Sequence, residues 1–207
     1  MTKWIQRILA FLLASLMSLA CLLLPALISS ACFSVPTHAA TANGPLATDT
    51  ASDPRHDFDF HFGTWHSHIR RVLNPFAGAA RSIELNGKVT VRRVWGGRAQ
   101  IEEIEADGPN GHWEGLTLFL YNPVSRQWSQ NFASSQSGLL TTGLVGSFKH
   151  GRGEFYAPDI YQGRAILVRG VWSNITRNAH HYEESYSDDG GLTWSPVFIV
   201  DLTRLDS

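Results

Sequence analysis

The chain has 207 residues, of which 43% are hydrophobic, 17% charged and 11% aromatic. This composition is that of a globular protein with a core and argues against a largely disordered chain, and the length fits one medium domain. The formal net charge of −1 lacks the basic excess of a nucleic-acid-binding protein, so no nucleic-acid partner is expected.

Residues 1–42 have the three-part layout of a secretory signal. Lys3 and Arg7 supply the positive charge, an apolar leucine-rich run follows from Ile8 to Leu24, and Ala40-Thr41-Ala42 suits signal peptidase. We expect cleavage and export to the periplasm or the medium. An uncleaved membrane anchor stays open as an alternative, because the apolar run approaches the roughly 20 residues that span a bilayer.

Both cysteines, Cys21 and Cys32, lie in this first segment. Each follows an alanine, as a lipidated cysteine often does, so lipidation is a further alternative. A cleaved chain would keep no thiol for a disulfide, a nucleophile or a metal. Residues 43–55 are rich in small and turn-forming residues and are interpreted as a linker. Contact with a membrane is expected only through the N-terminal segment.

Residues 56–205 are predicted to form one all-β domain. Short runs of β-branched and aromatic residues recur between glycine, proline and asparagine, and no long stretch has helical spacing. Turns as tight as Gly96-Gly97 join neighbouring antiparallel strands, since a parallel crossover needs a dozen or more residues. The predicted strands are 64–73, 82–94, 98–106, 113–121, 126–133, 142–149, 153–157, 164–173, 179–187 and 195–203.

About ten hairpin-linked strands would leave two exposed edges in an open sheet, and closing the sheet removes both edges. We therefore predict an antiparallel up-and-down barrel, with a two-sheet sandwich as the alternative. A barrel of this strand number can be too wide for its side chains to fill, which leaves an apolar pocket with a few polar groups.

The first predicted strand opens with Gly63-Thr64-Trp65, after the lead-in Phe58-Asp59-Phe60. A glycine two residues before a tryptophan resembles the start of lipocalin-like, or calycin, barrels. Five later segments join it: Glu114-Gly115-Leu116, Tyr121-Asn122-Pro123, Arg126-Gln127-Trp128-Ser129, Gly153-Glu154-Phe155-Tyr156 and Ser187-Asp188-Asp189-Gly190-Gly191-Leu192-Thr193-Trp194.

With these segments, the chain from about His56 to Arg204 resembles the bacterial domain family of unknown function DUF1579. The resemblance implies a lipocalin-like barrel whose base is closed by a short turn, with Trp65 packed over it. It carries no agreed activity, so no catalytic residue is transferred from it.

Ser187-x-Asp189-x-Gly191-x-Thr193-Trp194 is predicted to be a turn device. Asp189 can accept backbone N–H groups across the turn, the glycines supply positive φ, and Trp194 can fold back over the hairpin. The same spacing occurs in the Asp-boxes of sialidases. In those proteins it occurs once per blade and lies away from the catalytic site, and here it occurs only once, so it does not indicate glycosidase activity.

His66 and His68 are two residues apart and share one strand face, which would suit a metal if His180, His181 or Glu103 converged on them. If Trp65 points inward, however, both histidines point to solvent. We prefer this second reading and expect no metal and no cofactor.

Arg169 and Glu183 are charges within otherwise apolar or aromatic strands, and Arg71 shares the strand face of Trp65. Because unpaired burial would be costly, they must face water, pair with each other or hold a polar ligand inside the barrel. Structural ion pairing is the default, and a grip on an anion or carboxylate is the alternative. Arg177 and Arg204 are expected to be solvated charges at strand ends.

The favoured function is an exported barrel that binds a small, mostly apolar ligand with a polar or anionic end. One alternative is a structural or interaction protein of the cell envelope with a filled barrel. Another is an isomerase or hydrolase that uses His181, Glu183 and Arg169 as acid, base and anion stabiliser, although no catalytic motif supports it. No oligomeric state is predicted. The candidate ligand-binding residues are Trp65, Arg71, Trp113, Trp128, Arg169 and Glu183.

Overall fold

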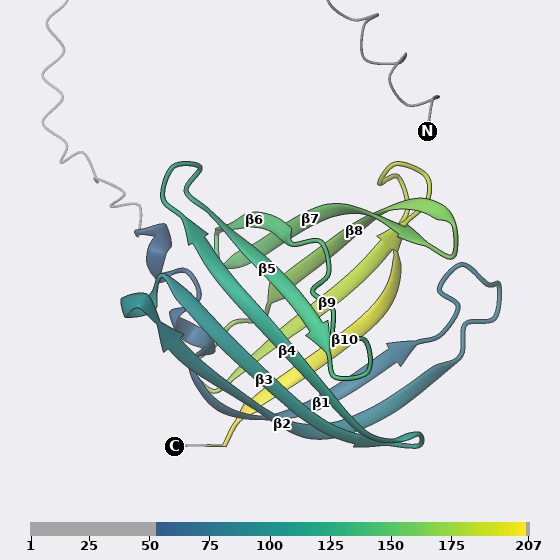
Figure 1. The fold of residues 1–207 in the computed structure, drawn as a ribbon, viewed down its shortest axis with the longest axis horizontal. Helices are drawn as coiled ribbons and strands as arrows, with labels where there is room; N and C mark the ends of the chain where they lie inside the picture. Colours follow the sequence, from purple (N-terminus) through teal and green to yellow (C-terminus); the bar gives the residue numbers. More distant parts are fainter. Residues whose placement is uncertain (1–52, 206–207) are drawn as a thin grey trace, which may run out of the picture. The chain divides into compact units, whose positions relative to one another are not determined.

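The structure is a computed structural model that describes residues 53–205. Ten antiparallel strands close into one barrel, in which each strand pairs with its neighbours in the chain and β1 pairs with β10 (Figure 1). The strands are β1 (Gly63–Val72), β2 (Ser82–Val94), β3 (Ala99–Gly108), β4 (Gly111–Asn122), β5 (Gln127–Ser134), β6 (Leu144–Lys149), β7 (Arg152–Tyr161), β8 (Arg164–Ser173), β9 (Ala179–Ser187) and β10 (Ser195–Arg204).

The closed barrel confirms the predicted architecture, and the alternative two-sheet sandwich is not formed. Strands β2, β8 and β9 have the limits expected from the sequence, whereas β7 continues to Tyr161, four residues beyond its predicted end. The added residues pair with the start of β8 across a tight hairpin. The predicted signal segment, residues 1–42, lies outside the described residues. Between residues 53 and 205, no helix is long and apolar enough to cross a membrane.

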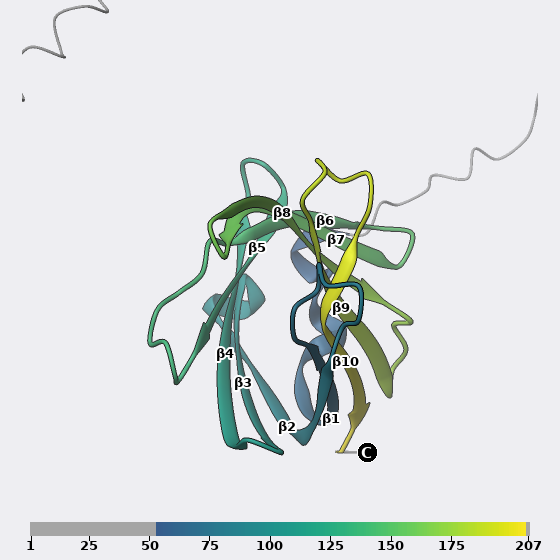
Figure 2. The ribbon, with the colours of Figure 1, turned by 90° about the vertical axis from the view of Figure 1, so that its right-hand side faces the viewer.

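One end of the barrel is closed by residues 53–62, which we call the base plug. It contains two short 3₁₀ helices, η1 (Pro54–His56) and η2 (Asp59–His61), which lie between the barrel walls (Figures 1 and 2). Phe58, between the two helices, is fully buried among aromatic rings that include Phe119 and Trp172. The third 3₁₀ helix, η3 (Trp95–Gly97), links β2 to β3.

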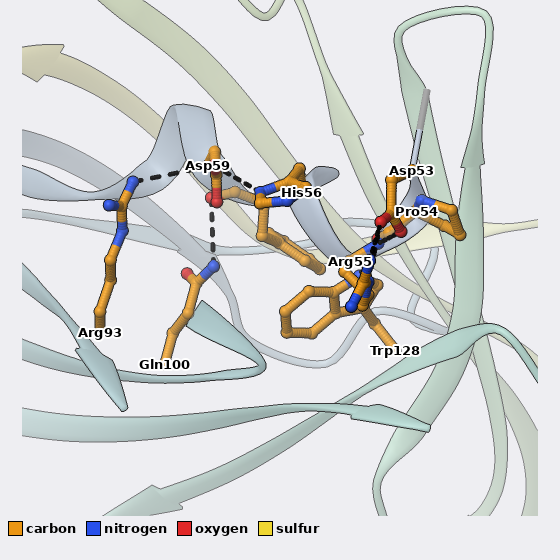
Figure 3. A network of polar contacts seen from close by, with 9 residues as sticks. Asp53, Pro54, Arg55, His56, Asp59, Arg93, Gln100 and Trp128 are labelled. Atoms are coloured by element: carbon orange, nitrogen blue, oxygen red, sulfur yellow. Dashed lines mark hydrogen bonds and ion pairs between the residues drawn. The ribbon is translucent and has the colours of Figure 1, made fainter. Parts of the chain in front are cut away.

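Side chains of the wall hold the base plug through its backbone carbonyls. The indole Nε1 of Trp128 donates to the carbonyl oxygen of Pro54 at 2.8 Å, and Nε2 of Gln100 donates to that of Phe58 at 3.2 Å (Figure 3). Asp59 in the same plug lies 3.7 Å from the guanidinium of Arg93. Residues 54 and 55, within the stretch interpreted as a linker, thus lie in the helix that caps the barrel.

Arg204 clamps the base plug to the first strand, which corrects the expectation of a solvated charge. Its guanidinium lies 4.0 Å from the ring centre of Trp65 and donates to the carbonyl oxygens of Phe62 at 2.9 Å and Phe60 at 3.2 Å. A Cβ at Gly63 would lie 2.6 Å from the Arg204 guanidinium, and Gly63 has a φ of +112°. The Gly-x-Trp spacing therefore makes room for this arginine.

The first strand alternates as expected. Trp65, Ser67 and Ile69 are buried, whereas His66 and His68 are exposed on the outer face. The interpretation of both histidines as solvent-facing is confirmed, and His68 lies 3.2 Å from the carboxylate of Glu84 outside the barrel. Across residues 53–205, no three His, Cys, Asp or Glu side chains are grouped so that they could hold a metal.

The turn between β9 and β10 has the predicted chemistry. The carboxylate of Asp189 accepts from the backbone N–H groups of Leu192 and Thr193, at 3.0 Å each, and from the Thr193 hydroxyl. These hydrogen bonds hold the pKa of Asp189 well below its usual value. Gly190 and Gly191 both have positive φ, as the turn requires.

Candidate functional site: a cavity inside the barrel

A cavity of about 410 Å³ occupies the barrel between the base plug and the loops at the opposite end, which we call the mouth. Its lining reaches the β1–β2 loop at Asn74 and Pro75 and the β5–β6 loop at Thr141 and Thr142. Most of the wall is apolar. Representative apolar side chains in it are Ile69, Ile104, Trp113, Val168, Phe198 and Leu202.

Strand β9 carries a polar row along the inside of the barrel. Because alternate residues share a face, His180, Tyr182, Glu184 and Tyr186 all point inward. His180 lies at the base plug, 4.3 Å from Trp65 between ring centres, and the other three side chains line the cavity in order towards the mouth.

The first polar network joins this row to the base plug. Nε2 of His180 lies 2.9 Å from Nδ1 of His61, and Nε2 of His61 lies 2.7 Å from a carboxylate oxygen of Glu102. The Thr117 hydroxyl donates to the other Glu102 oxygen at 2.5 Å. Glu102 and Thr117 line the cavity, so this network ends at its inner surface.

A second network runs towards the middle of the cavity. The indole of Trp172 donates to Gln130 at 3.1 Å, Gln130 donates to the Tyr182 hydroxyl at 2.9 Å, and that hydroxyl lies 3.3 Å from the carboxylate of Glu184. A Cβ at Gly170 would lie 2.6 Å from the Tyr182 hydroxyl, so the glycine leaves the space that this hydroxyl occupies.

Burial shifts the pKa values along β9. Removal from water raises the pKa of Glu184 to about 7, with a smaller opposing effect from its hydrogen bond to Tyr182. Burial also raises the pKa of the Tyr182 hydroxyl well above its usual value. At the base, burial lowers the pKa of His180 to about 2, and its Nδ1 has no hydrogen-bond partner among the described residues.

Two of the six candidate residues line the cavity. Arg71, near the end of β1, faces the mouth, and its guanidinium lies 5.7 Å from the ring centre of Trp113. Trp65 and Trp128 also point inward but lie below the cavity in the core, where their indole N–H groups bond carbonyls of the base plug.

Arg169 and Glu183 lie on the outer face of the barrel, so they do not form the interior grip on a ligand that the sequence left open as the alternative to an ion pair. Trp172 on β8 and Tyr182 on β9 point inward, and Arg169 and Glu183 lie an odd number of residues from them on the same strands. The two charges do not pair with each other. Arg169 lies 4.4 Å from the ring centre of Trp194, and Glu183 accepts from the Ser185 hydroxyl at 2.8 Å.

His181 shares this outer face and lies 2.7 Å from the carboxylate of Asp201. The acid, base and anion stabiliser of the enzyme hypothesis are therefore all outside the cavity, and that version of an active site is wrong.

The sequence patterns did not predict the interior polar residues His61, Glu102, Gln130 and Glu184. One signal could have found Glu184, because it is two residues from Tyr182, whose large ring belongs inside. His61 carried no such signal, since it precedes the first strand and its partners lie 41 and 119 positions away.

Comparison with known proteins leaves the family undefined. No protein-family model matches the chain, and no curated protein matches it. The likeness to DUF1579 therefore stays a prediction from the residues quoted above.

Solved structures similar to the chain include the S-type phycobiliprotein lyase CPES from Guillardia theta. It has a TM-score of 0.49 and 12% identity, over 72% of this chain and 91% of that one. The structure of EF1p2_mFAP2b bound to DFHBI has a TM-score of 0.41 and 9% identity, over 73% of this chain and 98% of that one.

Proposed function

We propose that the protein is an exported barrel that binds a small, mostly apolar molecule with a polar end. The observation that carries the proposal is the cavity of about 410 Å³, which lies within the usual size range of ligand pockets. Apolar walls with a few convergent polar groups are typical of such sites. A cavity of this size counts against the alternative of a filled barrel.

Arg71 is the basic residue of the cavity lining and suits the polar end of a ligand near the mouth. Among residues 53–205 no carboxylate lies within ion-pairing distance of it, and its guanidinium lies over the ring of Trp113. A guanidinium without a carboxylate partner can bind an anion or a hydrogen-bond acceptor through two parallel donors.

Native mass spectrometry of the protein purified from its own host tests this function. The expected result is a co-purifying small molecule that organic extraction removes. Ala157→Trp would fill the cavity from β7 and should abolish retention, whereas Ala165→Trp, on the outer face of β8, should retain the molecule. Equal retention by the two variants, or a bare protein in every preparation, would contradict the proposal.

Export is tested by fractionating the host cells and sequencing the N-terminus of the recovered protein. A start after Ala42 in the periplasm or the medium is expected. Recovery of the intact chain from the cytoplasm would overturn this part of the proposal.

A further inference from the structure

We propose that Glu184 and the Tyr182 hydroxyl form a subsite, part-way along the cavity, for the ammonium group of an amphipathic amine. This inference rests on the proposed small-molecule function and names the chemistry of one ligand group. It differs from the anionic end expected from the sequence, because the residues that carry it are acidic.

Acidic side chains outnumber basic ones in the cavity lining. Glu102, Asp159 and Glu184 are acidic, and Arg71 is the one basic residue among the lining side chains. Two of the acids are already engaged, since Glu102 has Thr117 and His61 as partners, and Asp159 accepts from the N–H of Ile160 near the mouth. Glu184 has only neutral tyrosine hydroxyls as partners, that of Tyr182 at 3.3 Å and that of Tyr186.

No Lys, Arg or His side chain of the described residues lies within 4 Å of the Glu184 carboxylate. Its neighbours are Phe198 on β10, Gly170 on β8, and Tyr182 and Tyr186 on β9 itself. The carboxylate of Asp159 on β7 is close enough to add to the cost of a negative charge on Glu184. A carboxylate in such surroundings is costly to ionise unless a positive charge joins it.

Arg71 is not that partner. In the register, Arg71 pairs with Phe198 and Phe198 pairs with Glu184, so the two charges are two strands apart. With neighbouring strands spaced about 4.8 Å apart, their backbones are roughly 10 Å apart, and the two side chains form no ion pair. Each charge is therefore free to bind a group of a ligand.

An ammonium group supplies what Glu184 lacks. It brings the compensating charge and up to three N–H donors, enough for the carboxylate and for the oxygen of Tyr182. Its alkyl chain would lie against the apolar walls, whereas an anion at the same place would meet a second negative charge. Gly170, directly beside Glu184 in the register, leaves the space that the Tyr182 hydroxyl occupies, which keeps this hydroxyl next to the carboxylate.

Isothermal titration of the protein from its own host with decylammonium, decanol and decanoate tests the subsite. The three probes share one chain and differ in the charge of the head group. At about pH 8, where the amine is protonated, decylammonium should bind roughly tenfold or more tightly than the other two, as expected for a hydrogen bond to a charged group.

Glu184→Gln should remove that preference and leave the affinity for decanol unchanged, which also shows that the variant is folded. Glu183→Gln, one residue away on the outer face, is the matched control and should keep the wild-type preference.

The possible failures are distinguishable. If none of the three probes binds, the cavity is not a ligand site and the proposed function fails together with the subsite. If all three bind with equal affinity, or if Glu184→Gln keeps the preference for the amine, the proposed function stands and the ammonium subsite is wrong.

Discussion

At the scale of single residues, Arg204 shows how a charge at the end of the last strand stabilises the segment that precedes the first strand. A guanidinium can stack on an indole and still direct several N–H donors at carbonyl oxygens, which a lysine ammonium cannot do in the same geometry. In this barrel the indole is that of Trp65, and the carbonyls belong to the base plug. The last strand thereby fixes the segment that closes the barrel.

Arg204→Met should therefore destabilise the protein by about 2–4 kcal/mol, because it leaves partly buried carbonyls without donors and removes the cation–π contact. The measurement is the free energy of unfolding in denaturant. Arg177→Met is the matched control, since Arg177 is exposed and contributes only its backbone carbonyl to Arg204. It should change stability by no more than about 0.5 kcal/mol. Equal effects of the two substitutions would contradict the clamp.

Some residue positions were predictable and others were not, for a physical reason. On β1, the alternation of Trp65 and Ile69 with His66 and His68 is clear, so the inward face could be read correctly. On β8, Val171 is buried on the outer face while Trp172 is buried inside. Since hydrophobic residues occupy both faces there, hydrophobicity does not decide which way Arg169 points.

At the scale of elements, the wall of the barrel is weakest between β5 and β6. Their register covers only Trp128–Gln130 against Leu144–Gly146, whereas β2 and β3 pair from Asn86 to Val94. Beyond Gln130 the ladder ends, and the loop at the mouth is joined to β5 by a backbone hydrogen bond from Thr141 to Phe132 at 2.7 Å. Short pairing gives few hydrogen bonds that must break together, so this part of the wall should open first.

Native-state hydrogen exchange checks that order. Amides that bridge β5 and β6 should exchange at least about tenfold faster than amides that bridge β2 and β3, because local opening there disrupts less structure. Uniform protection around the barrel would show that the short register is not a weak point.

The ten strands were accessible from sequence because glycine and asparagine mark nearly every turn, and the turns fix where each strand ends. The base plug could not be predicted from the sequence. Short 3₁₀ helices have no hydrophobic period to recognise, and the side chains that hold this plug, Gln100 and Trp128, come from strands 42 and 74 positions further along the chain. Only the folded barrel brings them to Phe58 and Pro54.

At the scale of the whole molecule, a buried histidine and a buried glutamate change the stability of the protein in opposite directions as the pH changes. His180 stays neutral when folded and gains a proton near its usual pKa of 6.5 when unfolded, so it favours unfolding as the pH falls below that value. Glu184 holds its proton up to about pH 7 when folded but loses it near 4.5 when unfolded. It therefore favours unfolding as the pH rises between those values.

Comparison with Glu184→Gln isolates the second effect, since His180 is common to both proteins. Relative to the variant, the wild type should lose on the order of 3 kcal/mol of stability between about pH 4.5 and pH 7, and the difference should be constant outside that range. Denaturant unfolding at a series of pH values measures it. A difference that does not vary with pH would mean that Glu184 ionises in the folded protein as it does in water.

The function could be predicted from the sequence only as far as a closed barrel with an interior. The need to remove exposed strand edges predicts a closed sheet without any knowledge of side-chain contacts. A barrel with this many strands is wide enough to leave a cavity. The chemistry of that cavity depends on which residues of ten strands converge. The inward positions of Glu102 and Glu184 come from the phase of each strand and were not identified from the sequence.

The claim that a small apolar molecule occupies the barrel is tested most directly by a crystal structure with 10-bromodecanol, in which anomalous scattering locates the bromine. We predict that the bromine and its chain lie inside the cavity, between Trp113 and Tyr182. A bromine found only on the outer surface, with side chains filling the interior, would contradict the claim.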